Sequence, residues 1–348
     1  MPLKSVLQSL NYCKEFENML KNSMKEIFIS IIIPVFNEEE NIIPLYNEII
    51  SSVDNKYKDF EIIFANDGST DNSFQKLLEL NKKDKRVKII NFRKNFGQTS
   101  AIAAGFDFCK GDMIVTLDAD LQNDPADIPV IIDKLLDGYD IVNGWRKNRK
   151  DKFITRKIPS FFGNRLISFI TKVKLHDYGC TLRGFKREVV KNLTLYGEMH
   201  RYIPAIASKF GTRSIEIPVN HRKRKFGKSK YGIGRTFRVI LDLVSIKYLL
   251  SFSHRPLQIF GGLGMLMIGA GFLTGISLTY DKFFLKQPIA DRPLLFLTIL
   301  LIFLGFQVIT LGLIAEMLTK IYNEGLHHNT YSVRDKIGFE NENIDDST

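Results

Sequence analysis

The chain has 348 residues, of which 45% are hydrophobic, and a formal net charge of +11. This length and apolar content can bury the core of an α/β domain, which excludes an intrinsically disordered protein. The basic excess favours an acidic partner, and composition alone leaves nucleic acid, anionic lipid and phosphorylated small molecules open. Cys13, Cys109 and Cys180 are far apart and form no CxxC pair, so neither a disulfide framework nor a zinc knuckle is expected, and a reducing compartment fits.

Residues 1–26 are predicted to form a helix ahead of the main domain. Leucines and a valine fall near one helical face, which ordinary packing on the domain or on a neighbouring chain explains. Polar residues from Gln8 to Asn11 interrupt the apolar stretch, so a cleaved signal peptide is not expected. We assign this segment no chemistry.

Residues 27–234 are predicted to form one domain in which strands alternate with helices. Apolar runs rich in β-branched residues indicate strands at 29–33, 61–65, 87–92, 113–117 and 141–142. The predicted helices begin near Glu39, Asp71, Gln98 and Pro125. This alternation predicts an α/β fold whose mostly parallel sheet is covered on both faces and binds ligands at the carboxyl ends of its strands.

Acidic and amide side chains follow three of these strands, in PVFNE at 34–38, NDGSTD at 66–71 and DADLQ at 118–122. Asp118 and Asp120 flank one residue at a strand exit, which suits a hard divalent cation, with Gln122 as a further oxygen ligand. An Asp-x-Asp is more often a turn, but its place after an apolar strand favours the metal site. Oxygen ligands predict Mg²⁺ or Mn²⁺ bridging a diphosphate, without preference between the two metals.

The NDG sequence predicts a turn in which Gly68 takes a positive φ, and Asp67 is its expected functional member. No GxGxxG follows the first strand and no GxxxxGK[ST] occurs in the chain. The dinucleotide-binding and P-loop classes therefore lose their main support.

Two apolar runs without charge, 257–280 and 293–315, each exceed the roughly 20 residues that cross the hydrocarbon core of a bilayer. Buried core helices are the alternative, but uninterrupted runs of this length are rare in soluble domains. Residues 254–320 are therefore predicted to hold two transmembrane helices. The short linker 281–292 makes them a hairpin with both flanks on one side of the membrane.

Eight lysines and arginines and no acidic residue lie between Arg222 and Arg238, against three basic residues in the linker. The positive-inside rule therefore predicts an integral protein of the cytoplasmic (inner) membrane. The domain at 27–234, both termini and a tail at 321–348 are expected in the cytoplasm.

Two features near the predicted spans concern the bilayer and other copies of the chain. Residues 235–253 carry apolar residues at helical spacing, which predicts an amphipathic helix on the membrane surface, with packing against the domain as the alternative. Gly271 and Gly275 form a GxxxG spacing, which points to a homo-oligomer, either a dimer or a tetramer.

The ordered motifs resemble the family 2 glycosyltransferases, which have the GT-A fold with a Rossmann-like, mostly parallel sheet. Within that family they resemble the polyprenyl-phosphate group, which includes dolichol-phosphate mannose synthases and bacterial undecaprenyl-phosphate sugar transferases. The resemblance covers nearly the whole chain. It rests on IPVFNE at 33–38, NDGSTD at 66–71, NFGQ at 95–98, DADLQ at 118–122, DYGC at 177–180 and the basic segment through GKSKY at 227–231.

The resemblance implies a nucleotide-sugar donor, a divalent cation and a polyprenyl-phosphate acceptor at a membrane bilayer. The residues expected to line the base and ribose pocket are Pro34, Phe36, Glu38 and Asp67. The residues expected to hold Mg²⁺ or Mn²⁺ and the donor diphosphate are Asp118, Asp120 and Gln122.

Arg146 lies in Gly144-Trp145-Arg146, where the family usually has Gly-Ser-Arg, and the resemblance places its guanidinium near the phosphates. Trp145 changes the shape of the pocket around it. Asp177 is assigned to the catalytic residues together with Arg146 and the Asp118–Asp120 pair, while a helix cap is the alternative role of Asp177.

The basic segment is expected to meet the acceptor phosphate and the departing nucleotide through Arg222 and the turn Lys228-Ser229-Lys230. A juxtamembrane run attracted to lipid also explains the charge, but it does not explain Gly227. A turn that grips phosphate explains both, because glycine lets the backbone approach closely.

The expected reaction is an inverting, metal-dependent transfer. A phosphate monoester has its second pKa near about 6, so the acceptor is largely a dianion at neutral pH and needs no strong general base. UDP-hexoses are favoured over GDP-mannose because residues 177–191 and 200–204 resemble the bacterial undecaprenyl-phosphate enzymes.

Three other functions were weighed against this one. A processive polysaccharide synthase is disfavoured because the chain lacks a QxxRW signature and has two predicted spans. A membrane scaffold without activity is distinguished by testing purified protein for nucleotide-sugar turnover. Nucleic acid is not an expected partner, because the basic run lacks interleaved aromatics and adjoins a membrane span.

Overall fold

The computed structural model describes residues 27–147, 165, 167–168, 171, 173–195, 197–224, 256–289, 292–325 and 331–339. The helices predicted at 1–26 and 235–253 and the Lys228-Ser229-Lys230 turn lie outside these residues. The chain divides into two compact units, which are taken separately below. The first comprises 1–235 and 329–348, and the second comprises 236–328.

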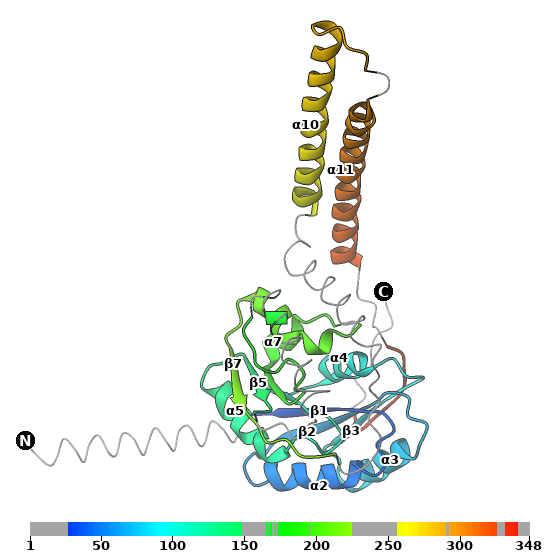
Figure 1. Cartoon of the computed structure of the whole chain (residues 1–348). Coiled ribbons are helices and arrows are strands. Elements are labelled where there is room, and N and C mark those ends of the chain that lie inside the picture. The colour runs from blue at the N-terminus through cyan, green and yellow to red at the C-terminus, as the bar shows by residue number, and fades with distance from the viewer. Residues whose placement is uncertain are drawn as a thin grey trace, which may run out of the picture. The chain divides into compact units, whose positions relative to one another are not determined.

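An eight-stranded sheet organises the first unit, in the order β7-β5-β6-β4-β1-β2-β3-β8 (Figure 1). Its strands are β1 (Ile29–Val35), β2 (Phe60–Asn66), β3 (Val87–Phe92), β4 (Met113–Thr116), β5 (Ile141–Trp145), β6 (Arg183–Lys186), β7 (Ser214–Pro218) and β8 (Val333–Ile337). Strands β4, β1, β2 and β3 run parallel, as do β5 and β7, whereas β6 and β8 pair antiparallel with their neighbours. The predicted α/β fold with a mostly parallel sheet is confirmed.

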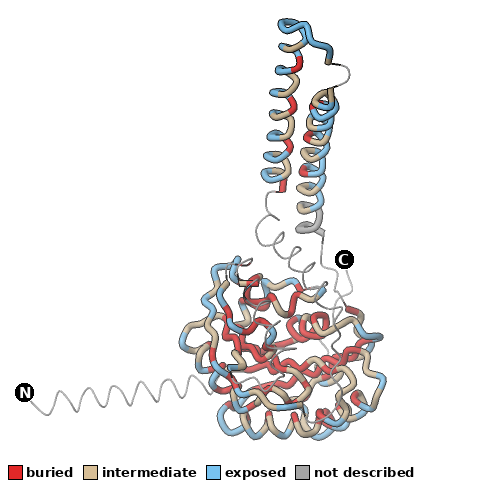
Figure 2. Tube along the Cα trace, viewed as in Figure 1, coloured by how far each residue is buried: buried red, intermediate tan, exposed pale blue. Residues whose placement is uncertain are grey.

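Helices cover both faces of this sheet (Figure 1). They are α2 (Ile42–Val53), α3 (Ser73–Lys83), α4 (Gln98–Phe108), α5 (Ile128–Leu136), α7 (Arg187–Lys191) and α8 (Ile203–Ala207), with short 3₁₀ turns at Pro125–Asp127, Met199–Arg201 and Ser208–Phe210. Alternate residues of β1 serve the two faces, as the pleat of a strand requires. Ile31 and Ile33 belong to the core shared with α2, α3 and α5. Ile32 lies against Gly105 of α4, and the strands of the sheet carry much of the buried core (Figure 2).

The loop after β2 depends on Gly68, which has φ +63°, as the sequence predicted. A β-carbon at this position would lie 2.4 Å from the backbone carbon of Lys94. The conformation and the space therefore both require glycine, which lets the 94–97 loop pass directly over the end of β2.

The sequence pattern does not predict strand β8, which lies within residues 321–348, where a tail is expected. Ile337 pairs with Ile89 at the outer edge of β3. Tyr331 stacks on Phe92 with ring centroids 5.1 Å apart, and its hydroxyl donates a hydrogen bond of 2.6 Å to Asp107 of α4. The residues after the second apolar run thus complete the sheet begun by the first part of the chain.

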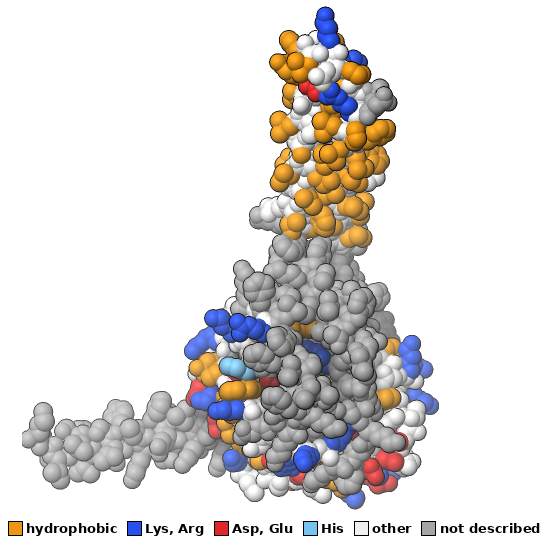
Figure 3. All heavy atoms as spheres, in the orientation of Figure 1, with side chains coloured by type: hydrophobic (Ala, Val, Ile, Leu, Met, Phe, Trp, Pro, Cys, Tyr) orange, Lys and Arg blue, Asp and Glu red, His pale blue; other side chains and the backbone are white. Residues whose placement is uncertain are grey.

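The second unit is a hairpin of two long helices, α10 (Pro256–Phe283) and α11 (Pro293–Gly325). Their candidate membrane spans, Pro256–Phe283 and Pro293–Thr319, have mean hydropathies of 1.8 and 2.6. Large apolar side chains face outward along both helices (Figure 3). Their length and exposed apolar surface are those of membrane-spanning helices, and the two predicted apolar runs are confirmed as helices.

Small residues bring α10 and α11 together. A β-carbon on Gly264 would lie 2.5 Å from the carbonyl oxygen of Gly305, and one on Gly271 would meet Ile302 at 2.6 Å. Thr298 donates a hydrogen bond of 2.9 Å to Thr274 across the pair. Gly271, which the sequence suggested for contacts between copies, therefore packs the two helices of one chain.

We expect Gly68→Ala to destabilise the first unit by about 3 kcal/mol, through the left-handed backbone and the clash with Lys94 together. Gly211→Ala is the matched control, because Gly211 has φ +71° and nothing within 4 Å of its added β-carbon. It should lose only about 1 kcal/mol. Thermal unfolding of the purified variants measures both, and equal losses would refute the proposed clash.

Candidate active site

The loops after β1 and β2 are bonded to each other at the carboxyl edge of the sheet. The Asn37 N–H donates to Ser69 Oγ at 2.9 Å, and the Thr70 N–H donates to Asn37 Oδ1 at 2.8 Å. Asn37 has φ +52°, an uncommon conformation for a residue other than glycine. Such strain persists only where the surroundings hold it, often at a functional site. The loop bearing Phe36 and Glu38 is therefore tightly fixed.

Asp67 lies at the end of β2 and holds the next loop. Its two carboxylate oxygens accept the backbone N–H groups of Phe96, at 2.6 Å, and Gly97, at 2.9 Å. Burial raises its pKa to about 6, against the two hydrogen bonds, which lower it. In this structure the Asp67 carboxylate fixes the loop that begins α4, the helix that carries Gln98.

Asp118 and Asp120 meet beyond β4, where the sequence placed a cation site. Gln98 Nε2 donates to Asp118 at 2.7 Å. Burial and the charge of Asp120 raise the pKa of Asp118 to about 6, while Arg146 and Arg224 lower it. Leu121, in the same loop, has φ +59°. The pair is a strained, partly desolvated anionic site.

The donor set fits Mg²⁺ or Mn²⁺. The described residues contain no group of three or more His, Cys, Asp or Glu side chains that could hold a metal. Two neighbouring carboxylates are nevertheless sufficient for such an ion when substrate phosphates and water complete its coordination. A cation bound between Asp118 and Asp120 would neutralise their negative charge and so relieve the repulsion between the two carboxylates. Gln122 makes its contacts through the backbone, its N–H donating to Asp120 at 3.1 Å.

The start of the basic segment runs alongside this loop. His221 forms a bridge with Asn123, and the Arg222 N–H donates to the Gln122 carbonyl at 2.8 Å. The Arg222 guanidinium lies 2.6 Å from Glu48 and 2.6 Å from Asp124. Arg222 is therefore held beside the metal-site loop by two carboxylates.

Arg224 is a functional candidate that sequence reasoning did not single out. Its guanidinium lies 2.6 Å from Glu38 and 3.5 Å from Asp120. It thus joins the loop after β1 to the loop after β4 and brings positive charge to the anionic site. Arg224 lies in a long basic run, and the local sequence does not show that this arginine contacts Glu38 and Asp120.

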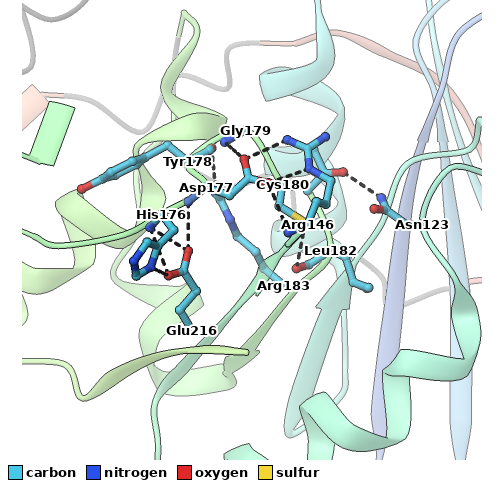
Figure 4. A network of polar contacts seen from close by, with 11 residues as sticks. Asn123, Arg146, His176, Asp177, Tyr178, Gly179, Cys180, Leu182, Arg183 and Glu216 are labelled. Atoms are coloured by element: carbon cyan, nitrogen blue, oxygen red, sulfur yellow. Dashed lines mark hydrogen bonds and ion pairs between the residues drawn. The ribbon is translucent and has the colours of Figure 1, made fainter. Parts of the chain in front are cut away.

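Arg146 and Asp177 form a two-pronged ion pair next to the same site (Figure 4). Arg146 Nε and Nη2 donate to the two Asp177 oxygens at 2.7 and 2.9 Å. Burial opposes the charge of Arg146, but bonding to Asp177 outweighs it and keeps the arginine pKa above its ordinary value. Asp177 therefore holds a buried cation, a role that differs from the helix cap that the sequence left open.

Comparison with known proteins shows the family to which the chain belongs. Residues 30–194 match the family model described as Glycosyl transferase family 2. The dodecaprenyl-phosphate galacturonate synthase of Rhizobium johnstonii is 40% identical over 315 residues, 89% of this chain and 93% of that protein. The chain belongs to the family 2 glycosyltransferases and is a glycosyltransferase enzyme, as its motifs predicted.

Two further matches concern a second sequence relative and a solved structure. The undecaprenyl-phosphate 4-deoxy-4-formamido-L-arabinose transferase of Edwardsiella ictaluri is 37% identical over 299 residues, 85% of this chain and 90% of that protein. Glucosyl-3-phosphoglycerate synthase from Mycobacterium tuberculosis, solved with Mn²⁺, UDP and phosphoglyceric acid, has a TM-score of 0.52 and 17% identity, covering 66% of this chain and 81% of that chain. This structural likeness shows the shared fold.

The raised pKa of Asp67 predicts a pH-dependent contribution to stability. A carboxyl group whose folded pKa of about 6 exceeds its ordinary value of 3.8 becomes costly once ionised, so its contribution falls as pH rises from about 4 through about 6. Asp67→Asn removes this ionisation. We therefore expect the stability of the variant relative to wild type to rise by on the order of 2 kcal/mol across that interval.

Unfolding midpoints measured from pH 4 to pH 7 check this expectation. Asp59→Asn, at an exposed position just before β2, is the control for the same chemical change. A difference between Asp67→Asn and wild type that stays constant with pH would show that burial does not raise the Asp67 pKa.

Proposed function

We propose that this glycosyltransferase moves a sugar from a nucleotide-sugar, a UDP-hexose above all, to a polyprenyl phosphate such as undecaprenyl or dolichyl phosphate. The observation that carries the proposal is the meeting of the Asp118–Asp120 pair with Arg146 and Arg224. Carboxylates for a cation and arginines for phosphate are what two phosphorylated substrates require. The printed names of the two sequence relatives, both polyprenyl-phosphate sugar enzymes, support the acceptor.

The donor is proposed to bind at the loops after β1, β2 and β4. Pro34, Phe36 and Glu38 line the base and ribose pocket, and Asp67 shapes it by holding the loop at Phe96 and Gly97. Asp118 and Asp120, with Gln122 as a further oxygen donor, would hold a Mg²⁺ or Mn²⁺ ion, which would supply positive charge to the diphosphate that leaves.

The proposed reaction is a direct displacement with inversion. An acceptor phosphate oxygen attacks the anomeric carbon and forms the new carbon–oxygen bond. The bond from that carbon to the donor diphosphate breaks, and its electron pair leaves with the nucleoside diphosphate. Arg146 and Arg224, with Arg222 and Lys230 on the acceptor side, offset the repulsion between the two phosphorylated substrates.

The site is proposed to work at the cytoplasmic face of the inner membrane. Strand β8 follows α11 yet belongs to the sheet that precedes α10. Two crossings return the chain to the side it left, so a membrane-spanning hairpin keeps β8 with the rest of its sheet. The basic run that begins at Arg222 favours the cytoplasmic side.

A GDP-mannose-dependent polyprenyl-phosphate mannose synthase is the second candidate, because the same acidic pair and arginines serve either nucleotide. The deciding experiment incubates the purified full-length protein with undecaprenyl phosphate, MnCl₂ and single nucleotide-sugars, and reads the glycolipid by mass spectrometry. UDP-hexoses, including UDP-hexuronic acids, should give product. Product from GDP-mannose alone would favour the second candidate, and no product from any donor would refute the proposed function.

We expect Asp120→Asn to lower kcat/KM by roughly 10²-fold or more, because it removes charge that acts on the departing diphosphate. Chelation of divalent metal should abolish wild-type transfer, and added Mn²⁺ or Mg²⁺ should restore it. Glu79→Gln, at an exposed position of α3, is the matched control. Normal turnover of Asp120→Asn at saturating metal would remove Asp120 from the metal site.

We expect Arg222→Ala to raise the KM for polyprenyl phosphate about tenfold, the effect of losing about 1.4 kcal/mol of binding, with little change in the donor KM. Lys223→Ala tests whether the loss of any nearby positive charge suffices, because Lys223 is the exposed neighbour. Steady-state kinetics with each substrate varied separately measure the split. Equal effects on both KM values would argue against an acceptor-side role.

A further inference from the structure

Glu216 of β7 takes no part in the site described above, yet it holds the turn that carries Asp177 (Figure 4). Its side chain, 11% exposed, accepts the backbone N–H of His176 at 2.9 and 3.0 Å and that of Asp177 at 3.0 Å. It also bonds to His176 Nδ1 at 2.7 Å. One carboxylate thus binds three groups of two consecutive residues.

The same turn delivers the partner of the buried arginine. Asp177 uses both oxygens on Arg146, and its Oδ1 also accepts the Gly179 N–H at 3.1 Å. The register of the parallel pair β5 and β7 places Glu216 opposite Asn143, on the strand that leads into Arg146. Glu216 is therefore joined to Arg146 by the sheet and by the turn.

A buried guanidinium needs its carboxylate at a fixed distance, because burial without the partner is costly. The position of the Arg146 guanidinium then depends on where the backbone of Asp177 lies. That backbone is set by the hydrogen bonds to Glu216, whose two acceptor oxygens are supplied by a rigid strand.

We propose that Glu216 is a positioning residue for the transfer reaction, which fixes Arg146 through the His176–Asp177 turn by accepting that turn's backbone N–H groups. The role for catalysis rests on the proposed function, in which Arg146 offsets substrate phosphate charge. The claim that Glu216 fixes the position of the His176–Asp177 turn does not rest on that function, and it can be tested without substrate.

The chain supplies its own probe of this geometry. Trp145 is its single tryptophan and directly precedes Arg146. Its ring stacks on His176 with centroids 4.5 Å apart and planes at 22°. Glu216 bonds to both the backbone N–H and the ring Nδ1 of His176. The fluorescence of the whole chain therefore reports whether the His176–Asp177 turn is in place.

Two substitutions separate hydrogen bonding from charge. Glu216→Ala removes every acceptor, and we expect kcat/KM to fall about 10- to 100-fold, as for other groups that orient a functional side chain. Glu216→Gln keeps an oxygen that can accept the two backbone N–H groups, and we expect it to restore transfer to within about threefold of wild type. Loss in Glu216→Gln equal to that in Glu216→Ala would refute a backbone-holding role.

A double-mutant cycle tests whether Glu216 acts through Arg146. Arg146→Ala should itself lower kcat/KM, and adding Glu216→Ala to it should lower the rate no further, because the arginine to be positioned is gone. Multiplicative losses in the double variant would overturn the proposal. Thermal unfolding of each variant separates a misplaced turn from a misfolded chain, and Glu216→Asp, one methylene shorter, substitutes for Glu216→Ala if the latter does not fold.

Tryptophan fluorescence tests independently whether Glu216 holds the His176–Asp177 turn in place. His176→Ala gives the reference spectrum of Trp145 without its stacking partner. We expect Glu216→Ala to shift emission and acrylamide quenching toward that reference, and Glu216→Gln to retain the wild-type signal. An unchanged Glu216→Ala signal overturns the proposal. A wild-type protein inactive with every nucleotide-sugar refutes the proposed function instead, and the fluorescence still decides whether Glu216 positions the turn.

Discussion

The candidate active site depends on one electrostatic constraint, which is that negative charge gathered in partly buried surroundings must be met by positive charge. The parallel strands β1 and β4 bring Glu38, Asp118 and Asp120 to one edge of the sheet, and burial together with the charge of Asp120 raises the pKa of Asp118. Arg224 bridges Glu38 and Asp120, and the charge of Arg146, which is paired with Asp177, lowers the pKa of Asp118. The positive charge of Arg224 and Arg146 therefore offsets the negative charge gathered at this edge of the sheet.

Much of the fold was predictable because the strands that form its centre are apolar and nearly continuous. Strands β1 to β4 were predicted within two residues of their observed bounds, since buried parallel strands need apolar residues on both faces. Strands β6 (RGFK), β7 (SIEIP) and β8 (VRDKI) were missed. They are short and contain polar or charged residues, and each owes its strand conformation to a partner distant in sequence. The local sequence pattern does not show which distant strand a segment pairs with.

The residues of the candidate site also fall into two groups, those expected from their place after a strand and those whose role depends on a distant partner. Asp118, Asp120 and Glu38 were predicted from their place after strands, a rule of chain direction and sheet geometry. Arg224 and Glu216 were not, because their roles come from partners that folding brings close. Arg224 and Glu38 are 186 residues apart, and Glu216 and Asp177 are 39 apart. Asp67 was placed correctly at the edge, but its hydrogen bonds to Phe96 and Gly97 depend on a loop whose path the sequence does not specify.

Strand β8 imposes an order on biosynthesis. Its Asp335 bonds to Asn91 of β3 across 244 residues of chain, and both apolar helices lie between them in sequence. During translation the outer edge of β3 stays unpaired until both helices of the hairpin have left the ribosome, because β8 is synthesised after them. An open edge invites pairing with other chains. The final strand therefore makes completion of the sheet a late event, which follows synthesis of both apolar helices.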